Sequence, residues 1–206
     1  MKCGGLVLCG GRSSRMGQDK VWLPFGPETM LQRVVRLVGE AVGPVHVVCA
    51  AGSRLPELPA DVRIVHDRRP DRGPLEGLAS GLAAMGQVSD AGDRIQAAFV
   101  TSCDVPLLTP QFIRRMIELL GTDDIAAPHV DGRSHPLAAV YRASVLPHAE
   151  RLLAADQLRL TRMLDEVPTR LVGPEELLDV DPNLGSLRNI NSPEEYRAAL
   201  AEVEAL

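Results

Sequence analysis

Short apolar runs of strand length alternate with segments of helical periodicity through the first half of this chain. Thr29 and Gln32 form a capping box ahead of an apolar pattern with helical spacing. A second helix is expected to begin at Gly73-Pro74, and a third to run from Thr109-Pro110 to a stop at Gly121. Because strands that alternate with helices pair in parallel, the pattern predicts a three-layer, Rossmann-like α/β domain with a mostly parallel sheet. The expected strands are Leu6–Cys9, Val45–Ala50, Val62–His66 and Ala97–Thr101, the second and third of them buried.

The second half of the chain is less regular. Apolar runs at Ile125–Pro128 and Leu137–Tyr141 flank an Asp131-Gly132 turn, which predicts at least one antiparallel pair there. Ser192-Pro193-Glu194-Glu195 combines a capping box with an early proline and is expected to begin a terminal helix. Residues 86–95 are expected to form a surface loop. Since no linker or repeat interrupts the pattern, residues 1–206 are expected to form a single domain.

Charge and apolar patterning exclude two classes of function. The formal net charge of -5 argues against bulk nucleic-acid binding, which needs a basic face. No apolar stretch approaches the ~20 residues of a membrane span, and the N-terminus has no signal-peptide pattern. We therefore expect a cytoplasmic protein without membrane contact. Four cysteines without C-x-x-C spacing are expected to be buried, reduced thiols: Cys3, Cys9, Cys49 and Cys103.

The loop after the first expected strand has the composition of a polyphosphate site. Gly10-Gly11 brings backbone without Cβ atoms close to a ligand, and Arg12, Arg15 and Lys20 add positive charge within the same loop. The spacing differs from a Walker A motif, and no G-x-G-x-x-G is present. The sequence therefore predicts a different kind of nucleotide loop.

Two aspartates follow later strands and are expected at the same edge of the sheet. Asp67 comes after the third strand and Asp104 after the fourth. Ligands of open α/β sheets bind outside the carboxyl ends of the strands. Because Mg²⁺ prefers one or two carboxylates together with substrate phosphates, these residues are candidates to hold it against a triphosphate.

Several blocks, in order along nearly the whole chain, carry a family resemblance. They are Leu8-Cys9-Gly10-Gly11, Arg15-Met16-Gly17, Asp19-Lys20, Asp67, Gly73-Pro74-Leu75-Glu76-Gly77, Ser102-Cys103-Asp104-Val105-Pro106, His135-Pro136-Leu137 and Asn189-Ile190-Asn191-Ser192-Pro193-Glu194. With these blocks the chain resembles the MobA-type molybdenum cofactor guanylyltransferases, within the nucleotide-diphospho-sugar transferase-like nucleotidyltransferases. The first block alone indicates only the broader class, whereas its combination with the later blocks is specific.

The resemblance implies a reaction, its substrates and its site residues. GMP is transferred from GTP to the phosphate of Mo-molybdopterin, giving the guanine dinucleotide cofactor and pyrophosphate. It implies Mg²⁺ as cofactor and allows transient contact with other molybdenum cofactor enzymes. The implied catalytic residues are Arg15, Lys20 and Asp104, and the implied metal ligands are Asp104 and Asn191. Nucleotide binding falls to Leu8, Cys9, Gly10, Gly11, Arg15, Lys20, Asp67 and Asp104, and the pterin candidates are Arg133 and His135.

The chain departs from the family pattern at two positions. The family commonly has alanine where this chain has Cys9, and a nucleotide-contacting asparagine where it has Ala50. Gly52 or Ser53 is a candidate to replace the second contact.

The sequence is also compatible with three other functions. A molybdopterin cytidylyltransferase uses the same acceptor, and a sugar-1-phosphate nucleotidyltransferase shares the opening loop. A non-catalytic nucleotide-binding regulatory module is the alternative from a different class.

Overall fold

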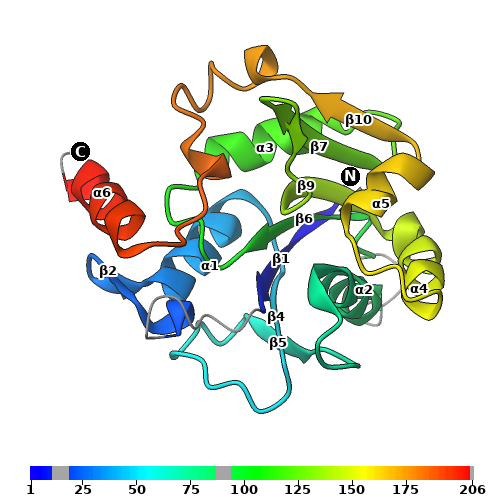
Figure 1. Ribbon diagram of the computed structural model, residues 1–206, viewed down its shortest axis with the longest axis horizontal. Helices are drawn as coiled ribbons and strands as arrows, with labels where there is room; N and C mark the ends of the chain where they lie inside the picture. The colour runs from blue at the N-terminus through cyan, green and yellow to red at the C-terminus, as the bar shows by residue number, and fades with distance from the viewer. Residues whose placement is uncertain (11–18, 87–93, 205–206) are drawn as a thin grey trace.

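The computed structural model describes residues 1–10, 19–86 and 94–204. Its middle layer is a mixed eight-stranded sheet in the order β10-β7-β9-β6-β1-β4-β5, with β8 paired to β7 (Figure 1). A separate two-stranded sheet joins β2 to β3. The strands are β1 (Cys3–Cys9), β2 (Pro24–Phe25), β3 (Glu28–Thr29), β4 (Val45–Cys49), β5 (Arg63–His66), β6 (Ala97–Ser102), β7 (Ile125–Val130), β8 (Arg133–Ser134), β9 (Ala138–Arg142) and β10 (Thr169–Val172).

Within the eight-stranded sheet, strand pairing is parallel in the N-terminal half and mixed in the C-terminal half, whereas the separate β2–β3 pair is antiparallel. β1 pairs in parallel with β4 and β6, and β4 with β5. β9 lies antiparallel between β6 and β7, while β10 pairs in parallel with β7. The predicted mostly parallel sheet with an antiparallel strand in the C-terminal half is confirmed. Asp131-Gly132 forms the expected turn, with φ of 52° and 72°, but it joins β7 to the short β8 rather than directly to β9.

The expectation that Val62–His66 forms a buried strand is wrong. β5 spans Arg63–His66, and only Val65 among its four residues is even half-buried. Ile64 is 52 % exposed. The reason is position: β5 pairs with β4 alone and forms one edge of the sheet. By contrast, all five residues of β4 are buried, as predicted.

Helices cover both faces of the sheet and form the outer two layers (Figure 1). α1 and α3 pack on one face, and α2, α4 and α5 pack on the other. The three-layer prediction is confirmed. α6 packs through Ala199 against Phe25, Met30 and Ile190, beside β2. The helices are α1 (Met30–Ala41), α2 (Gly73–Gly86), α3 (Pro110–Leu119), α4 (Leu146–Ala154), α5 (Thr161–Glu166) and α6 (Pro193–Glu204).

Local sequence signals place the helix ends. Thr29 and Gln32 form the predicted capping box of α1, and the Thr109 hydroxyl caps α3 ahead of a proline. Gly121, with φ of 53°, follows the end of α3. Most of the loop expected at 86–95 lies outside the described residues. Within the described ranges, no helix combines the length and the apolarity needed to cross a membrane.

Missing Cβ atoms allow both helical layers to approach β1 closely. A Cβ at Gly5 would lie 2.2 Å from Cγ1 of Val38 in α1. On the other face, a Cβ at Gly81 of α2 would lie 2.7 Å from Cδ2 of Leu6. Contacts under 3 Å are not found between real carbon atoms, so these glycines set the layer spacing.

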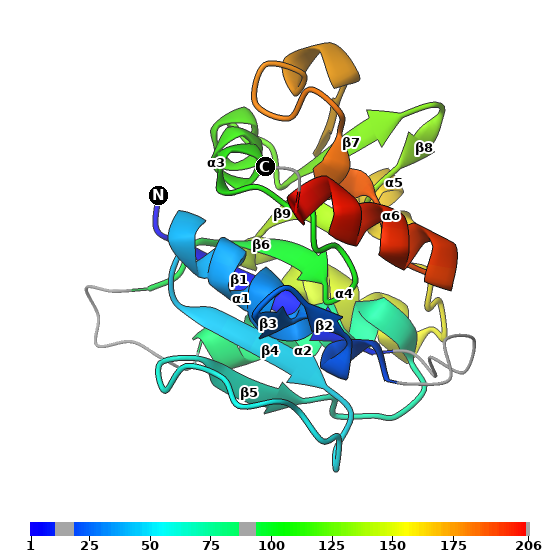
Figure 2. The same cartoon turned by 90° about the vertical axis from the view of Figure 1, so that its left-hand side faces the viewer.

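The strand order reverses between β1 and β6, which makes their carboxyl ends the switch point of the sheet. From β1 the chain moves outward to β4 and β5, and then returns through α2 to β6 on the other side of β1. β4, β5 and β6 point to the same side of the molecule (Figure 2). The polar segments that follow these strands are therefore gathered along one edge.

Candidate active site

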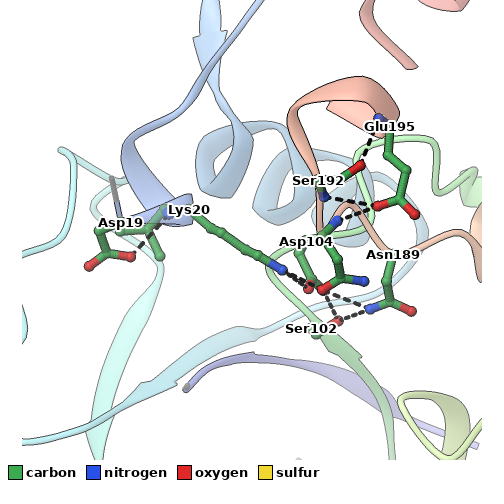
Figure 3. Close-up of polar contacts among 9 residues, drawn as sticks. Asp19, Lys20, Ser102, Asp104, Asn189, Ser192 and Glu195 are labelled. Carbon is green, nitrogen blue, oxygen red and sulfur yellow. Dashed lines mark hydrogen bonds and ion pairs between the residues drawn. The ribbon is translucent and has the colours of Figure 1, made fainter. Parts of the chain in front are cut away.

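Asp104 is the centre of a polar cluster just beyond the carboxyl end of β6 (Figure 3). Its Oδ1 accepts hydrogen bonds from the Ser102 hydroxyl at 2.5 Å and from the Asn189 side-chain amide at 2.8 Å. Its Oδ2 accepts from the Lys20 ammonium at 2.8 Å, in an ion pair whose side chains are 15 % and 16 % exposed. Because two neutral donors occupy Oδ1, the carboxylate presents Oδ2 to the cation.

Lys20 reaches the site from the segment that follows β1. It begins a short 3-10 turn, η2 (Lys20–Trp22), and the Asp19 carboxylate caps this turn by accepting from the Val21 backbone N–H at 3.4 Å. Val21 is 4 % exposed and anchors the turn in the core. The lysine side chain extends away from the turn toward Asp104 (Figure 3), and its ammonium also donates to Asn191 Oδ1 at 2.8 Å.

The segment ahead of α6 supplies two asparagines on either side of a buried residue. Ile190 is 1 % exposed, and its backbone N–H donates to the Asp104 carbonyl at 2.8 Å. This bond holds the segment against the end of β6. Asn189 and Asn191 then reach the site from both sides of Ile190, one to the aspartate and the other to Lys20.

Glu195 in the first turn of α6 fixes the end of this segment. Its carboxylate accepts from the backbone N–H of Asn191 at 2.6 Å and from that of Ser192 at 3.0 Å. The Ser192 hydroxyl accepts from the Glu195 N–H at 3.2 Å, which completes the predicted capping box (Figure 3). The helix start therefore positions Asn191.

The opening loop is described only at its two ends. Leu8 and Cys9 are buried in β1, and Gly10 is exposed where the strand ends. Gly11, Arg12 and Arg15 lie outside the described residues. The backbone N–H of Cys103 donates to the Leu8 carbonyl at 3.2 Å, which joins the base of the loop to the base of the Asp104 turn.

All four cysteines are buried and free, as predicted. Cys9 and Cys49 are register partners in β1 and β4, and Cys103 lies on the other side of Cys9. Hydrogen bonding to Cys103 and burial raise the pKa of the Cys9 thiol. Since the thiolate is the reactive form, the Cys9 thiol acts as a packing group beneath the site.

Asp67 stands apart from the Asp104 cluster, at the far end of the same edge. Its backbone N–H donates to the Cys49 carbonyl at 2.9 Å, just beyond β5. Three strand spacings separate β5 from β6, or about 14 Å. Burial and the neighbouring carboxylate of Glu76 raise the pKa of Asp67. Glu76 is 2 % exposed and accepts from the Ser80 hydroxyl at 3.2 Å.

The structure therefore separates the predicted carboxylates into two groups. Asp104 lies with Lys20 and Asn191 at the switch point, whereas Asp67 lies three strands away. Between them, Ala50, Gly52 and Ser53 form an exposed turn after β4, closed by a hydrogen bond from the Ser53 N–H to the Ala50 carbonyl at 3.1 Å.

Arg133 and His135 lie on the other side of Asp104, beyond Asn189. His135 lines a cavity of 180 Å³ together with Asn189, and a second cavity of 560 Å³ together with Arg133 and Arg188. Burial and the positive charge of Arg133 lower the pKa of His135. The two predicted residues thus border adjoining hollows that begin at the Asp104 cluster.

The donor set around Lys20 fits a hard divalent cation. A carboxylate oxygen of Asp104 and an amide oxygen of Asn191 converge on one positive group, the Lys20 ammonium. Mg²⁺ takes oxygen ligands and completes its shell with water and substrate phosphates. Within the described ranges, no cluster of three or more His, Cys, Asp or Glu side chains forms a complete protein cage.

Sequence reasoning assigned no catalytic or binding role to three residues that shape this site, although Glu195 was expected in the capping box of the terminal helix. Ser102 and Asn189 hold Asp104, and Glu195 holds Asn191. The signal available in the sequence was spacing: Asn189 and Asn191 flank one apolar residue, and Ser102 lies two residues before Asp104. That spacing places side chains on one side of extended backbone, but it does not name their partners.

The arrangement defines a class before it defines a family. The sheet is Rossmann-like, and a lysine, a carboxylate and an amide oxygen meet at its switch point. This combination is typical of nucleotide-binding α/β enzymes. A family model described as the MobA-like NTP transferase domain matches residues 5–170. The chain belongs to this family of nucleotidyltransferases.

Named relatives and a solved structure agree with this placement. A probable molybdenum cofactor guanylyltransferase of Mycobacterium avium (strain 104) is 35 % identical over 209 residues, covering 100 % of this chain and 98 % of that protein. One from Mycobacterium tuberculosis (strain ATCC 25618 / H37Rv) is 38 % identical over 167 residues, covering 78 % of each. The crystal structure of molybdopterin-guanine dinucleotide biosynthesis protein A from Archaeoglobus fulgidus has a TM-score of 0.80 at 20 % identity, covering 100 % of both chains, and is similar in fold.

Proposed function

We propose that this chain transfers GMP from GTP to the phosphate of Mo-molybdopterin, with release of pyrophosphate. The observation that carries the proposal is the convergence of Lys20, Asp104 and Asn191 at the switch point of the sheet. The relatives named as guanylyltransferases support guanine as the base and molybdopterin as the acceptor. Residues 1–206 act as one nucleotidyltransferase domain in this proposal.

Charge neutralisation is the main chemical task of the site. Negative charge develops on the transferred phosphoryl group and on the departing pyrophosphate. We assign the phosphates to Lys20, to Arg15 and to the backbone of Gly10 and Gly11. Asp104 and Asn191 would hold Mg²⁺. When bound, the ion would supply Lewis acidity to the phosphate groups.

No side chain of this chain has to act as nucleophile or general base. The acceptor is a phosphate, which is already ionised near neutral pH. The residues therefore work by orienting two anionic groups and by offsetting their repulsion. The ion pair of Lys20 and Asp104 is only about one sixth exposed, and partial burial of this kind strengthens such electrostatic effects.

The nucleoside end lies toward β4 and β5. We assign it to Asp67 together with the backbone at Leu8, Cys9 and Gly10. The span of about 14 Å between the ends of β5 and β6, three strand spacings, leaves room for a base and ribose between Asp67 and the phosphates at Asp104. A carboxylate accepts hydrogen bonds from a guanine edge or a ribose hydroxyl.

The acceptor end lies on the opposite side of Asp104. The cavities bordered by Asn189, His135, Arg133 and Arg188 offer cationic and amide groups to an anionic pterin. An acceptor bound in these cavities would bring its phosphate to the cluster from the Asn189 side. Contact with other molybdenum cofactor enzymes, for delivery or receipt of the pterin, is part of the proposal.

Competition among nucleotides tests the assignment. GTP, CTP, ATP and UTP are offered together with Mg²⁺ and molybdopterin loaded with molybdenum, and the dinucleotide products are identified by mass spectrometry. The expected result is the guanine dinucleotide, with pyrophosphate release that depends on the acceptor. Equal or faster formation of the cytosine product would overturn the guanylyl assignment. Tight GTP binding without any product would favour a regulatory module instead.

A further inference from the structure

Resting on this proposed function, we infer that the Lys20 ammonium occupies the divalent-metal position of the nucleotide-free protein and is exchanged for the metal ion. The observation is that one ammonium lies 2.8 Å from Asp104 Oδ2 and 2.8 Å from Asn191 Oδ1. These are the two oxygens assigned to Mg²⁺. An ammonium bonded to both oxygens lies where a cation coordinated by both would lie, so lysine and metal compete for that position.

The rest of the cluster keeps this pair of oxygens in place during the exchange. Ser102 and Asn189 hold Oδ1 of Asp104, so the carboxylate does not rotate when Oδ2 changes partner. Glu195 holds the backbone of Asn191 at 2.6 Å. None of these bonds involves Lys20. The oxygen pair is therefore positioned by neutral and backbone donors, and the cation between them is the interchangeable part.

Lysine suits this role because of its long side chain. Its ammonium has three donors on a flexible four-carbon stem that begins at the η2 turn, which the buried Val21 anchors. When the metal takes the oxygens, the ammonium is free to bind triphosphate oxygens a short distance away. The exchange therefore links metal binding to the positioning of the phosphate-binding lysine.

The exchange predicts an increase in metal affinity when Lys20 is replaced. A lysine that only binds phosphate would give no such increase. Removing the ammonium should tighten metal binding to the nucleotide-free protein, because the metal no longer has to displace a competitor. The same change should slow GMP transfer, because the phosphates lose a cation. Metal affinity and turnover then move in opposite directions.

Binding of Mn²⁺, a paramagnetic substitute for Mg²⁺, gives a readout that does not depend on activity. Free Mn²⁺ is measured by electron paramagnetic resonance with the nucleotide-free wild type and with Lys20→Met, Lys2→Met and Asp104→Ala. Lys20→Met should bind Mn²⁺ about tenfold more tightly, the order expected when a charge-assisted hydrogen bond to a carboxylate no longer has to be broken. Lys2→Met makes the same chemical change at the other end of β1 and should bind like wild type.

The outcomes separate this inference from the proposed function. Equal or weaker Mn²⁺ binding by Lys20→Met, with binding lost in Asp104→Ala, would overturn the exchange and leave the metal site standing. Wild-type binding by Asp104→Ala would overturn the metal site itself.

A measurement on the wild type covers the case in which Lys20→Met does not fold. The chain has two lysines, Lys2 and Lys20. In protein labelled with ¹³C and ¹⁵N at lysine, Mg²⁺ should shift the side-chain signal of Lys20 and leave that of Lys2 in place. An unmoved Lys20 signal at saturating Mg²⁺ would overturn the exchange.

Discussion

Replacing Asp104 with asparagine should disable the site as fully as alanine does, although asparagine has the same shape. Oδ1 of Asp104 accepts from Ser102 and Asn189, and Oδ2 accepts from Lys20. An asparagine amide has one oxygen and one NH₂ group. With its oxygen toward Lys20, the NH₂ group replaces the acceptor that Ser102 and Asn189 share, and both must reorient. Turned the other way, the NH₂ group faces the Lys20 ammonium, so neither orientation preserves the wild-type network.

The size of the effect follows from the contacts. A hydrogen bond to a charged partner contributes about 1.5–3 kcal/mol. At 1.36 kcal/mol for each factor of ten, losing one such bond in the transition state slows transfer about 10- to 150-fold. Loss of the metal ligand adds to this effect, so we expect kcat/KM to decrease at least about 100-fold. Removing one hydrogen-bond donor to the transition state has an effect of this order in other enzymes.

The assay is pyrophosphate release from GTP with loaded molybdopterin, measured over a range of Mg²⁺ concentrations. Asp104→Asn and Asp104→Ala should both lose the Mg²⁺ dependence while keeping the wild-type circular dichroism spectrum. Asp61→Asn, at an exposed position between β4 and β5, is the matched control and should behave like wild type. A rate for Asp104→Asn within threefold of wild type would refute the reasoning.

Two further predictions concern stability. Gly5→Ala should lower the free energy of unfolding, measured in urea, by about 1–3 kcal/mol, because the added Cβ overpacks against Val38. Gly86→Ala is the control, because its Cβ would meet nothing within 4 Å, and it should leave the free energy of unfolding unchanged. Equal stability of the two variants would contradict the packing argument. His46 is fully buried, and burial followed by the charge of Arg63 lowers its pKa below the ordinary value of 6.5. The unfolded chain therefore binds the proton more readily, so stability should be full above about pH 6.5 and fall as the pH decreases toward the folded-state pKa. In thermal melts across this pH window, the melting temperature of His46→Leu should fall less with acid than that of the wild type. An equal fall in both proteins would contradict this prediction.

The repeating part of the fold was predictable because its signals are local. Capping residues, prolines in first turns and apolar spacing placed α1, α2, α3 and α6, and unbroken apolar runs placed β1, β4 and β6. The failure at β5 has a physical cause. Whether a strand is central or at an edge depends on how many strands pair with it, and Val62–His66 carries no local signal of its single partner.

The C-terminal half was less predictable for a similar reason. β10 (Thr169–Val172) pairs with β7 (Ile125–Val130), more than thirty residues earlier, and no short pattern in either strand specifies that register. α4 and α5 depend on the face of the sheet that they cover. Their positions are decided by packing rather than by local propensity.

The amino-acid sequence by itself determined which chemical groups reach the carboxyl edge of the sheet. The loop after the first strand supplied Lys20, later strand ends supplied Asp67 and Asp104, and the helix start at Ser192 supplied Asn191. Only the tertiary structure decided which of them meet. Lys20 lies 84 residues from Asp104 and 171 from Asn191, yet its ammonium is within 2.8 Å of both, while Asp67 is left three strands away. Contact across such separations depends on the order of the strands in the sheet and on the hydrogen bonds that orient each carboxylate and amide. No local sequence pattern specifies either of them.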